Sequence, residues 1–242
     1  MILPKSSDAI HRAWLFRLLS ALANNQFLVE SLPFKGGTCA AMRGIVERFS
    51  VDLDFDVLNE KLMDKINSEL IKIFNDLGLE IKDSSTKVPQ FFLKYPNREG
   101  ERNTLKFDAT FPPPKANKYE PFRFVEIDRI LFCQTPETMF ANKLVTLKER
   151  FEKQKSIAGR DMFDIHTYFL KGFSYTKEVI EERRQVPVKK FFEELINFIE
   201  QHITQNIIDE DLNYLLDPET FQKSRKYLKQ EVLMFLRQAL AS

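Results

Sequence analysis

A glycine turn and an acidic strand lie close together in the sequence. Lys35-Gly36-Gly37-Thr38 forms the turn, and Asp52-Leu53-Asp54-Phe55-Asp56 follows a short helix later. Successive side chains of a strand point to opposite faces, so the three aspartates share one face and the apolar residues share the other. Like charges on one face repel one another, and a bound cation relieves that repulsion. The pattern predicts a site that holds a nucleoside triphosphate with magnesium.

The acids are the candidates for metal binding. Two-metal phosphoryl transfer needs acids that hold two magnesium ions about 3.5–4 Å apart. Asp52 and Asp54, two residues apart on one strand, are predicted to bridge the ions, and Asp108 is the candidate third ligand because it alternates with apolar residues in its own strand. The alternative is that the acidic face is only the solvated side of an edge strand. The upstream glycine pair favours the interpretation as a metal site. Of the three aspartates, Asp56 is expected to be solvated.

The residues around the glycine turn are predicted to bind the nucleotide. Gly36 and Gly37 let the backbone come close to phosphate oxygens, and the hydroxyl of Thr38 either caps the following helix or contacts a phosphate. No Gly-Lys-Ser/Thr follows, so the turn is not a Walker loop. We assign Lys35 and Ser50 to the same nucleotide-binding set.

A second group of charged residues lies in the C-terminal half. Lys143 is suited to neutralise triphosphate charge, and Asp161 to orient the lysine or an incoming hydroxyl. Taken alone, these two residues favour a plainer interpretation, a solvated helix face with a surface ion pair.

The elements that must position these residues divide the chain into two halves. Strand-like runs and helices alternate up to about residue 130, and helical periodicity dominates from residue 135 onward. This order indicates an α+β half, residues 1–132, followed by a helical half, residues 133–242. Helices are expected at 7–23, 25–31, 38–47, 59–77, 136–153, 160–171, 176–184, 187–202 and 217–240, and strands at 32–35, 50–57, 79–82, 88–95, 103–110 and 123–127.

Composition sets the outer limits of function. The chain has 242 residues, of which 43% are hydrophobic and 29% charged, so a packed core is expected. The formal net charge is only +1, so any nucleic-acid binding must come from local patches. Cys39 and Cys133 lack metal-ligand spacing and are expected to be reduced, buried thiols. Residues 1–8 are too polar and short for a signal peptide and no apolar run could span a bilayer, so we expect a cytoplasmic protein that binds no membrane.

Four sequence blocks, in this order, resemble the AbiEii/AbiGii toxin family of the DNA polymerase β-like nucleotidyltransferase superfamily. They are residues 34–38, 48–55, 141–144 and 160–164. The resemblance implies a nucleotidyltransferase domain with a mixed sheet flanked by helices, followed by a C-terminal helical bundle. It also implies the toxin of a toxin–antitoxin pair, often linked to phage defence, that transfers a nucleotide from a triphosphate to RNA such as tRNA and has a cognate antitoxin as partner.

The resemblance also assigns roles to individual residues. Asp52 and Asp54 match the metal-binding acids and Asp108 the third acid. Lys143 matches the nucleotide-contacting lysine and Asp161 the aspartate of the last motif. In the mechanism that follows, the acceptor attacks the α-phosphate and pyrophosphate leaves.

Two alternatives to an RNA acceptor remain open. One is transfer of the nucleotide to a protein side chain, and the other is a non-catalytic binding module that keeps the fold. Basic clusters on the helices favour RNA, although such runs are more often solvated faces. The clusters are Lys148, Arg150, Lys153, Lys155 and Arg160, then Arg183-Arg184, Lys189-Lys190, and Lys223, Arg225, Lys226 and Lys229.

Overall fold

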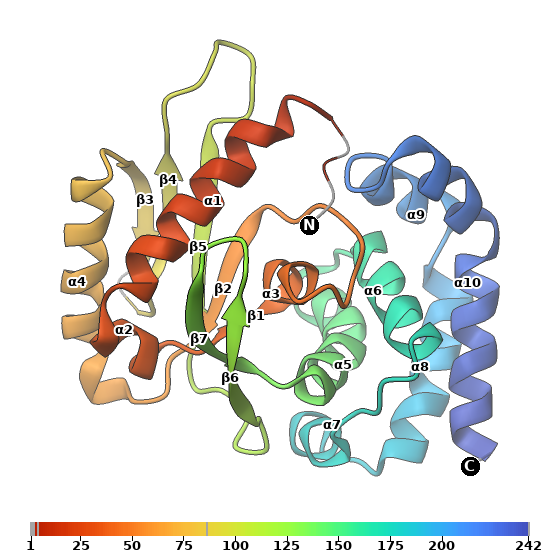
Figure 1. Cartoon of the computed structure of the whole chain (residues 1–242). Helices are drawn as coiled ribbons and strands as arrows, with labels where there is room; N and C mark the ends of the chain where they lie inside the picture. The colour runs from red at the N-terminus through yellow and green to blue at the C-terminus, as the bar shows by residue number, and fades with distance from the viewer. Residues whose placement is uncertain (1–2, 4, 86, 242) are drawn as a thin grey trace.

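The chain is built around one mixed β-sheet (Figure 1). The computed structural model describes residues 3, 5–85 and 87–241; the expectation for the N-terminal segment falls partly on residues 1, 2 and 4, outside this range. Within the described residues the sheet has seven strands in the order β3-β4-β5-β2-β1-β7-β6. The strands are β1 (Phe34–Lys35), β2 (Asp52–Asp56), β3 (Glu80–Ser85), β4 (Gln90–Lys94), β5 (Thr104–Thr110), β6 (Tyr119–Phe124) and β7 (Arg129–Gln134).

Strand pairing places the acidic strand in the middle of the sheet. β2 pairs with β5 in parallel and with β1 antiparallel, and β1 pairs with β7 in parallel. The remaining neighbours, β3–β4, β4–β5 and β6–β7, are antiparallel. The acidic strand is therefore not an edge strand, so the alternative of a solvated edge does not describe it.

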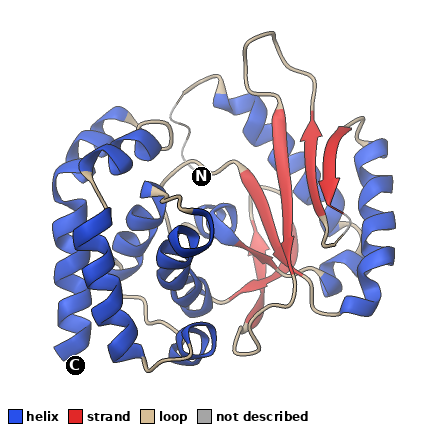
Figure 2. Cartoon of the chain, turned by 180° about the vertical axis from the view of Figure 1, so that it is seen from behind, coloured by secondary structure: helices blue, strands red, loops and turns tan. Residues whose placement is uncertain are grey.

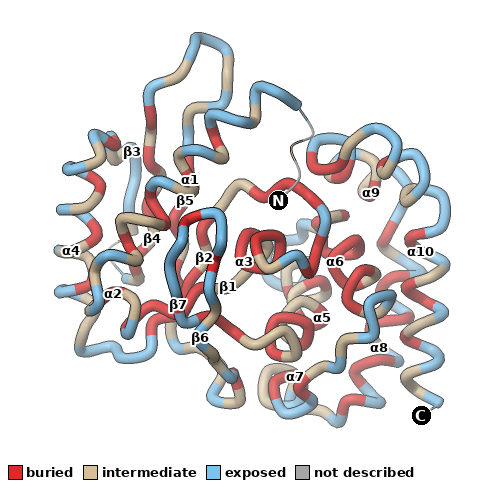
Figure 3. Tube along the Cα trace, viewed as in Figure 1, coloured by how far each residue is buried: buried red, intermediate tan, exposed pale blue. Residues whose placement is uncertain are grey.

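One face of the sheet packs against N-terminal helices. These are α1 (Asp8–Ala23), α2 (Gln26–Ser31) and α4 (Met63–Asp76), which follows the 3₁₀ turn Glu60–Leu62. Apolar side chains of β2 and β5 alternate inward with the acids outward, and the rings of Phe55 and Phe107 stack with their centroids 4.8 Å apart. Phe74 of α4 packs edge-on against Phe91 and Phe107 in the same layer. Figure 3 shows this buried layer through the centre of the molecule.

The C-terminal helices form a group beside the other end of the sheet (Figures 1 and 2). They are α5 (Pro136–Gln154), α6 (Gly159–Leu170), α7 (Lys177–Arg184), α8 (Val188–His202), α9 (Gln205–Leu212) and α10 (Pro218–Ala241). The short helix α3 (Gly36–Met42) packs against β1, β2 and α5 and so joins the two regions. Aromatic contacts hold the bundle together, including Phe140 of α5 stacked on Tyr168 of α6 at 4.8 Å.

The α+β fold with a mixed sheet and C-terminal helices is confirmed, while some element predictions were wrong. The strand expected at 123–127 lies earlier, at β6, and both β7 and α9 were missed. β7 was not predicted because it has apolar residues on both faces, so its sequence does not alternate. Ile130 and Phe132 lie on the outer face and are 59% and 42% exposed. The helix expected at 38–47 is α3, which begins at Gly36 and ends at Met42. The division into domains at 132/133 stays a prediction; β7 continues to Gln134 and α5 begins at Pro136.

Among the described residues, no helix is both long enough and apolar enough to cross a membrane.

Candidate active site

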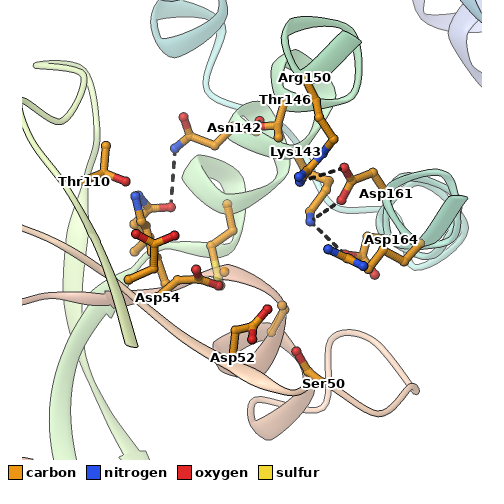
Figure 4. Close-up of a pocket in the computed structure, with 18 of the residues that line it drawn as sticks. Ser50, Asp52, Asp54, Thr110, Asn142, Lys143, Thr146, Arg150, Asp161 and Asp164 are labelled. Atoms are coloured by element: carbon orange, nitrogen blue, oxygen red, sulfur yellow. Dashed lines mark hydrogen bonds and ion pairs between the residues drawn. The ribbon is translucent and has the colours of Figure 1, made fainter. Parts of the chain in front are cut away.

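A cleft of about 660 Å³ separates the acidic strand from helices α5 and α6. Figure 4 shows Asp52 and Asp54 on one side and Lys143, Arg150 and Asp161 on the other. All of the predicted site residues except Thr38 line this cleft, namely Lys35, Gly36, Gly37, Ser50, Asp52, Asp54, Asp108, Lys143 and Asp161. The tertiary fold thus brings together residues that are more than 120 positions apart in the chain.

The two central acids reach the cleft from β2. Burial raises the pKa of Asp54 to about 6, and the negative charge of Asp52 adds to the effect. Burial also raises the pKa of Asp52, although the nearby charges of Arg160 and Lys106 oppose the rise. Two adjacent carboxyl groups that resist ionisation in this way form a site where a cation would be stabilised.

Asp108 lies directly across the sheet from Asp54 in the parallel register of β2 and β5. Its carboxylate forms an ion pair with Lys106 and accepts a hydrogen bond from Gln90 Nε2 at 3.0 Å. No group of three or more His, Cys, Asp or Glu side chains in the described part of the chain converges in a metal-binding arrangement. The carboxylates of Asp52 and Asp54 could bind a divalent ion without breaking an ion pair. Asp108 would first have to give up its ion pair with Lys106.

The two glycines are required by close packing. Gly36 has φ +77°, and a β-carbon there would overlap the carboxylate of Asp54. A β-carbon at Gly37 would come within 2.5 Å of the Arg48 guanidinium. The turn therefore brings bare backbone against the acidic strand and forms one wall of the cleft.

Thr38 lies beneath the cleft rather than in it. The residue is fully buried, and its Oγ1 is within hydrogen-bond distance of the Asp52 carbonyl oxygen and, at 2.9 Å, of Ser50 Oγ. These contacts attach α3 to the start of β2. The hydroxyl does not cap α3 and is not among the groups that line the cleft.

Asp56 is fully buried, so the expectation that it is solvated was wrong. It accepts hydrogen bonds from Lys35 Nζ at 2.6 Å, Gln134 Nε2 at 2.6 Å and the Tyr119 hydroxyl at 2.9 Å. Asn117 Nδ2 adds a longer bond of 3.2 Å. Asp56 thereby links β1, β2, β6 and β7. It differs from the other two acids of the strand because its carboxylate is paired with Lys35 and hydrogen-bonded inside the protein.

Lys143 and Asp161 do not form a surface ion pair on a solvated face. Lys143 Nζ lies 2.8 Å from Asp161 and 3.0 Å from Asp164, and both acids are buried. Burial by itself would lower the pKa of Lys143, but the two carboxylates outweigh it and raise that pKa. The lysine is therefore held as a charged group at the cleft wall.

Sequence reasoning assigned no role to Arg48 and Asp164. The Arg48 guanidinium donates to both carboxylate oxygens of Asp164, from Nε at 2.6 Å and from a terminal nitrogen at 2.7 Å. Burial opposes ionisation of Asp164, yet the charges of Arg48 and Lys143 prevail and lower its pKa to about 2. The signal was present in the spacing, since Asp164 follows Asp161 by three residues and shares its helix face.

Two arginines of the cleft have unused donors. Arg150 lies 3.4 Å from Asp161 Oδ2, but Arg150 Nε and Asp161 Oδ2 are buried without a hydrogen-bond partner. The side chain of Arg160 makes no hydrogen bond or ion pair with any residue that the structure describes. Other basic residues of the expected RNA-binding clusters are occupied: Lys148, Lys153, Arg183, Arg184, Lys223 and Arg225 all pair with nearby carboxylates.

Comparison with known proteins gives one family. The model of the AbiEii nucleotidyl transferase toxin, type IV toxin–antitoxin system, matches residues 17–238. The comparison with curated proteins finds no match.

Solved structures share the fold along nearly the whole chain. MenT4, a nucleotidyltransferase toxin of Mycobacterium tuberculosis, is 16% identical with a TM-score of 0.60, over 96% of this chain and 84% of its own. JHP933 from Helicobacter pylori is 18% identical with a TM-score of 0.58, over 99% and 95% of the two chains. An antigenic nucleotidyltransferase-like protein from Paracoccidioides brasiliensis is 15% identical with a TM-score of 0.52, over 86% and 95%. At these identities the likeness shows a common fold.

Proposed function

The chain belongs to the AbiEii nucleotidyltransferase toxin family, and from this premise we propose that it transfers a nucleotide from a nucleoside triphosphate to an RNA acceptor in a reaction that depends on Mg²⁺. In this reaction an acceptor hydroxyl attacks the α-phosphate, a new phosphodiester forms, and pyrophosphate leaves. The hydroxyl proton passes to solvent or to a nearby carboxylate. The toxin role and a cognate antitoxin partner are part of the same proposal.

The observation that carries the proposal is that the two carboxylates of β2 lie across one cleft from three cationic side chains of α5 and α6. Asp52 and Asp54 lie on the sheet side, while Lys143, Arg150 and Arg160 lie on the helix side. A triphosphate bound with a divalent ion presents both kinds of charge, with the metal toward the acids and the outer phosphate oxygens toward the cations.

The residues present fit a magnesium ion. Carboxylate oxygens are ligands that this ion prefers, and Asp52 and Asp54, half-buried side by side on the cleft wall, would hold it. Asp108 would hold a second ion after giving up its pairing with Lys106. When bound, magnesium supplies charge neutralisation and lowers the pKa of the attacking hydroxyl.

The remaining residues bind and orient the nucleotide. The backbone of Gly36 and Gly37 is free of side chains at the cleft wall, so phosphate oxygens can approach it closely. Lys143 stays charged between Asp161 and Asp164 and is available to the triphosphate. Ser50 and Lys35 border the same wall, whereas Thr38 contributes by holding α3 against β2.

The test is transfer of labelled nucleotide. The purified protein is incubated with Mg²⁺, total cellular RNA and each α-phosphate-labelled triphosphate in turn, beside Asp52→Asn and the surface control Asp128→Asn. Label in RNA with wild type and Asp128→Asn, but not with Asp52→Asn, is expected. Label in protein bands instead of RNA would show that the acceptor is a protein. Undiminished labelling by Asp52→Asn would contradict the assignment of the acids.

A further inference from the structure

The acidic face of the sheet continues beyond the cleft. The register sets Asp52 beside Lys106, Lys106 beside Phe92, and Phe92 beside Asp83, in one row across four strands. Neighbouring strands are about 4.8 Å apart, so Phe92 lies about 10 Å from Asp52 along the sheet surface. Residues in one row point to the same side of the sheet, and Phe92 therefore shares a surface with the acids.

This part of the surface has no covering helix. The helices that pack on the sheet near β4 lie on its other face, where Phe91 contacts Phe74 of α4. The main neighbours of β4 in the described chain are β3 and β5. Figure 2 shows these strands with no helix in front of them.

Phe92 is not part of the hydrophobic core. It is partly exposed, and among the described residues its ring has no ring–ring contact. The ammonium of Lys106 lies over the ring, 5.8 Å from its centroid. An aromatic ring held open on a sheet surface next to a cation is a suitable surface for stacking a nucleic-acid base.

Positive charge lies along the path from the ring to the acids. Lys106 stands between Phe92 and Asp52, and Arg102, in the connection between β4 and β5, is close enough for its charge to act on Asp52. Arg102 forms no ion pair within the described range of the chain. Asp83 ends the row on the β3 side, so the positive charge of this row does not extend past β4.

We propose that this surface, formed by Phe92, Lys106 and Arg102, binds the single-stranded 3′ end of the acceptor RNA. Phe92 stacks one terminal base, and the two cations contact the adjoining phosphates. The terminal ribose hydroxyl is thereby directed toward Asp52. This inference rests on the proposed nucleotidyl transfer and adds the location of the acceptor.

The test is binding of a 5′-fluorescein-labelled eight-nucleotide single-stranded RNA, followed by fluorescence anisotropy across a range of salt concentrations. Phe92→Leu removes the stacking ring, Arg102→Gln removes a phosphate contact, and Phe132→Leu is the matched control because Phe132 is another exposed sheet phenylalanine, on β7. Circular dichroism melting checks that all variants fold.

We expect Phe92→Leu to weaken binding about 10-fold with an unchanged salt slope. Arg102→Gln should reduce the slope of log affinity against log salt by about 0.7, and Phe132→Leu should match wild type. Equal binding by Phe92→Leu and wild type, or no binding by wild type, would overturn the proposal. Labelling of a protein acceptor that Phe92→Leu leaves unchanged would also overturn it.

A thermal-shift measurement with Mg²⁺ and triphosphate separates the two proposals. If the thermal shift persists in Phe92→Leu and this variant also binds RNA as wild type does, the proposed acceptor surface is refuted while the proposed nucleotide site is retained. Absence of any shift in wild type counts against the proposed function itself.

Discussion

Gly36 and Asp54 lie so close together that the space for a β-carbon at Gly36 is already filled by the Asp54 carboxylate. The glycine turn and the acidic strand are thus one structural unit, in which the absence of a side chain at one position fixes the place of a charged group at the other. The antiparallel pairing of β1 with β2, which sets Lys35 opposite Asp54, brings them together.

The first prediction concerns this contact. Gly36→Ala should lose at least about 10-fold in transfer activity because the new methyl group displaces Asp54. Gly44→Ala is the matched control, since Gly44 has a similar φ of +70° but open space around its α-carbon. Both substitutions carry the backbone cost of about 1 kcal/mol for a left-handed alanine. Equal activities of the two variants would show that the overlap has no catalytic consequence.

The second prediction separates two acids of one strand. Asp54→Asn should unfold at a urea concentration equal to or above that of wild type, because it removes one of two neighbouring, partly desolvated carboxylates that repel each other. Transfer should fall by at least about 100-fold. Asp56→Asn should lose about 2–3 kcal/mol of unfolding free energy because Lys35 and three other donors lose their charged acceptor. A strongly destabilised Asp54→Asn would contradict this division of roles.

The third prediction is a dependence on acidity. The folded pKa of Asp164 is lowered to about 2 from an ordinary value of 3.8. A lowered carboxyl pKa stabilises the folded state at pH values above 3.8, and this stabilisation is lost as the pH falls through 2. Asp164→Asn should cost about 3–5 kcal/mol at pH 7 because Arg48 is left buried without its partner. The gap between the variant and wild type should narrow by about 2 kcal/mol between pH 5 and pH 2. Urea unfolding at several pH values measures this difference in unfolding free energy. A difference that stays constant with pH would show that the lowered pKa of Asp164 is not its source.

The fourth prediction tests the lysine of the cleft. Lys143→Met should lower kcat/KM for the triphosphate by about 10- to 100-fold, because a charged contact to phosphate is worth about 1.5–3 kcal/mol. Lys148→Met is the matched control: both side chains are 17% exposed on α5, but Lys148 pairs with Glu194 outside the cleft. Steady-state kinetics with varied triphosphate concentration measures kcat/KM for both variants. Comparable losses in both variants would assign the effect to the helix rather than to the nucleotide.

The sequence alone determined the fold class and most of the elements. Alternation in β2 and β5 and the helical periodicity after residue 135 are local properties, so they can be read without knowledge of the fold. The glycine turn, the acids and the later lysine and aspartate could also be selected, because chemistry restricts which residue types can serve. The family blocks then gave these residues their order.

Tertiary structure decided which partner each charge has. Asp52, Asp54 and Asp56 are equivalent in sequence spacing, yet Asp56 is enclosed by donors from four other segments, whereas Asp54 lines the cleft beside Asp52, whose charge raises its pKa further. The pairing of Arg48 with Asp164 and the row from Asp52 to Phe92 depend in the same way on contacts between distant segments. Local pattern fixes the direction of a side chain on its own element, but burial and charge depend on what the rest of the chain brings against it.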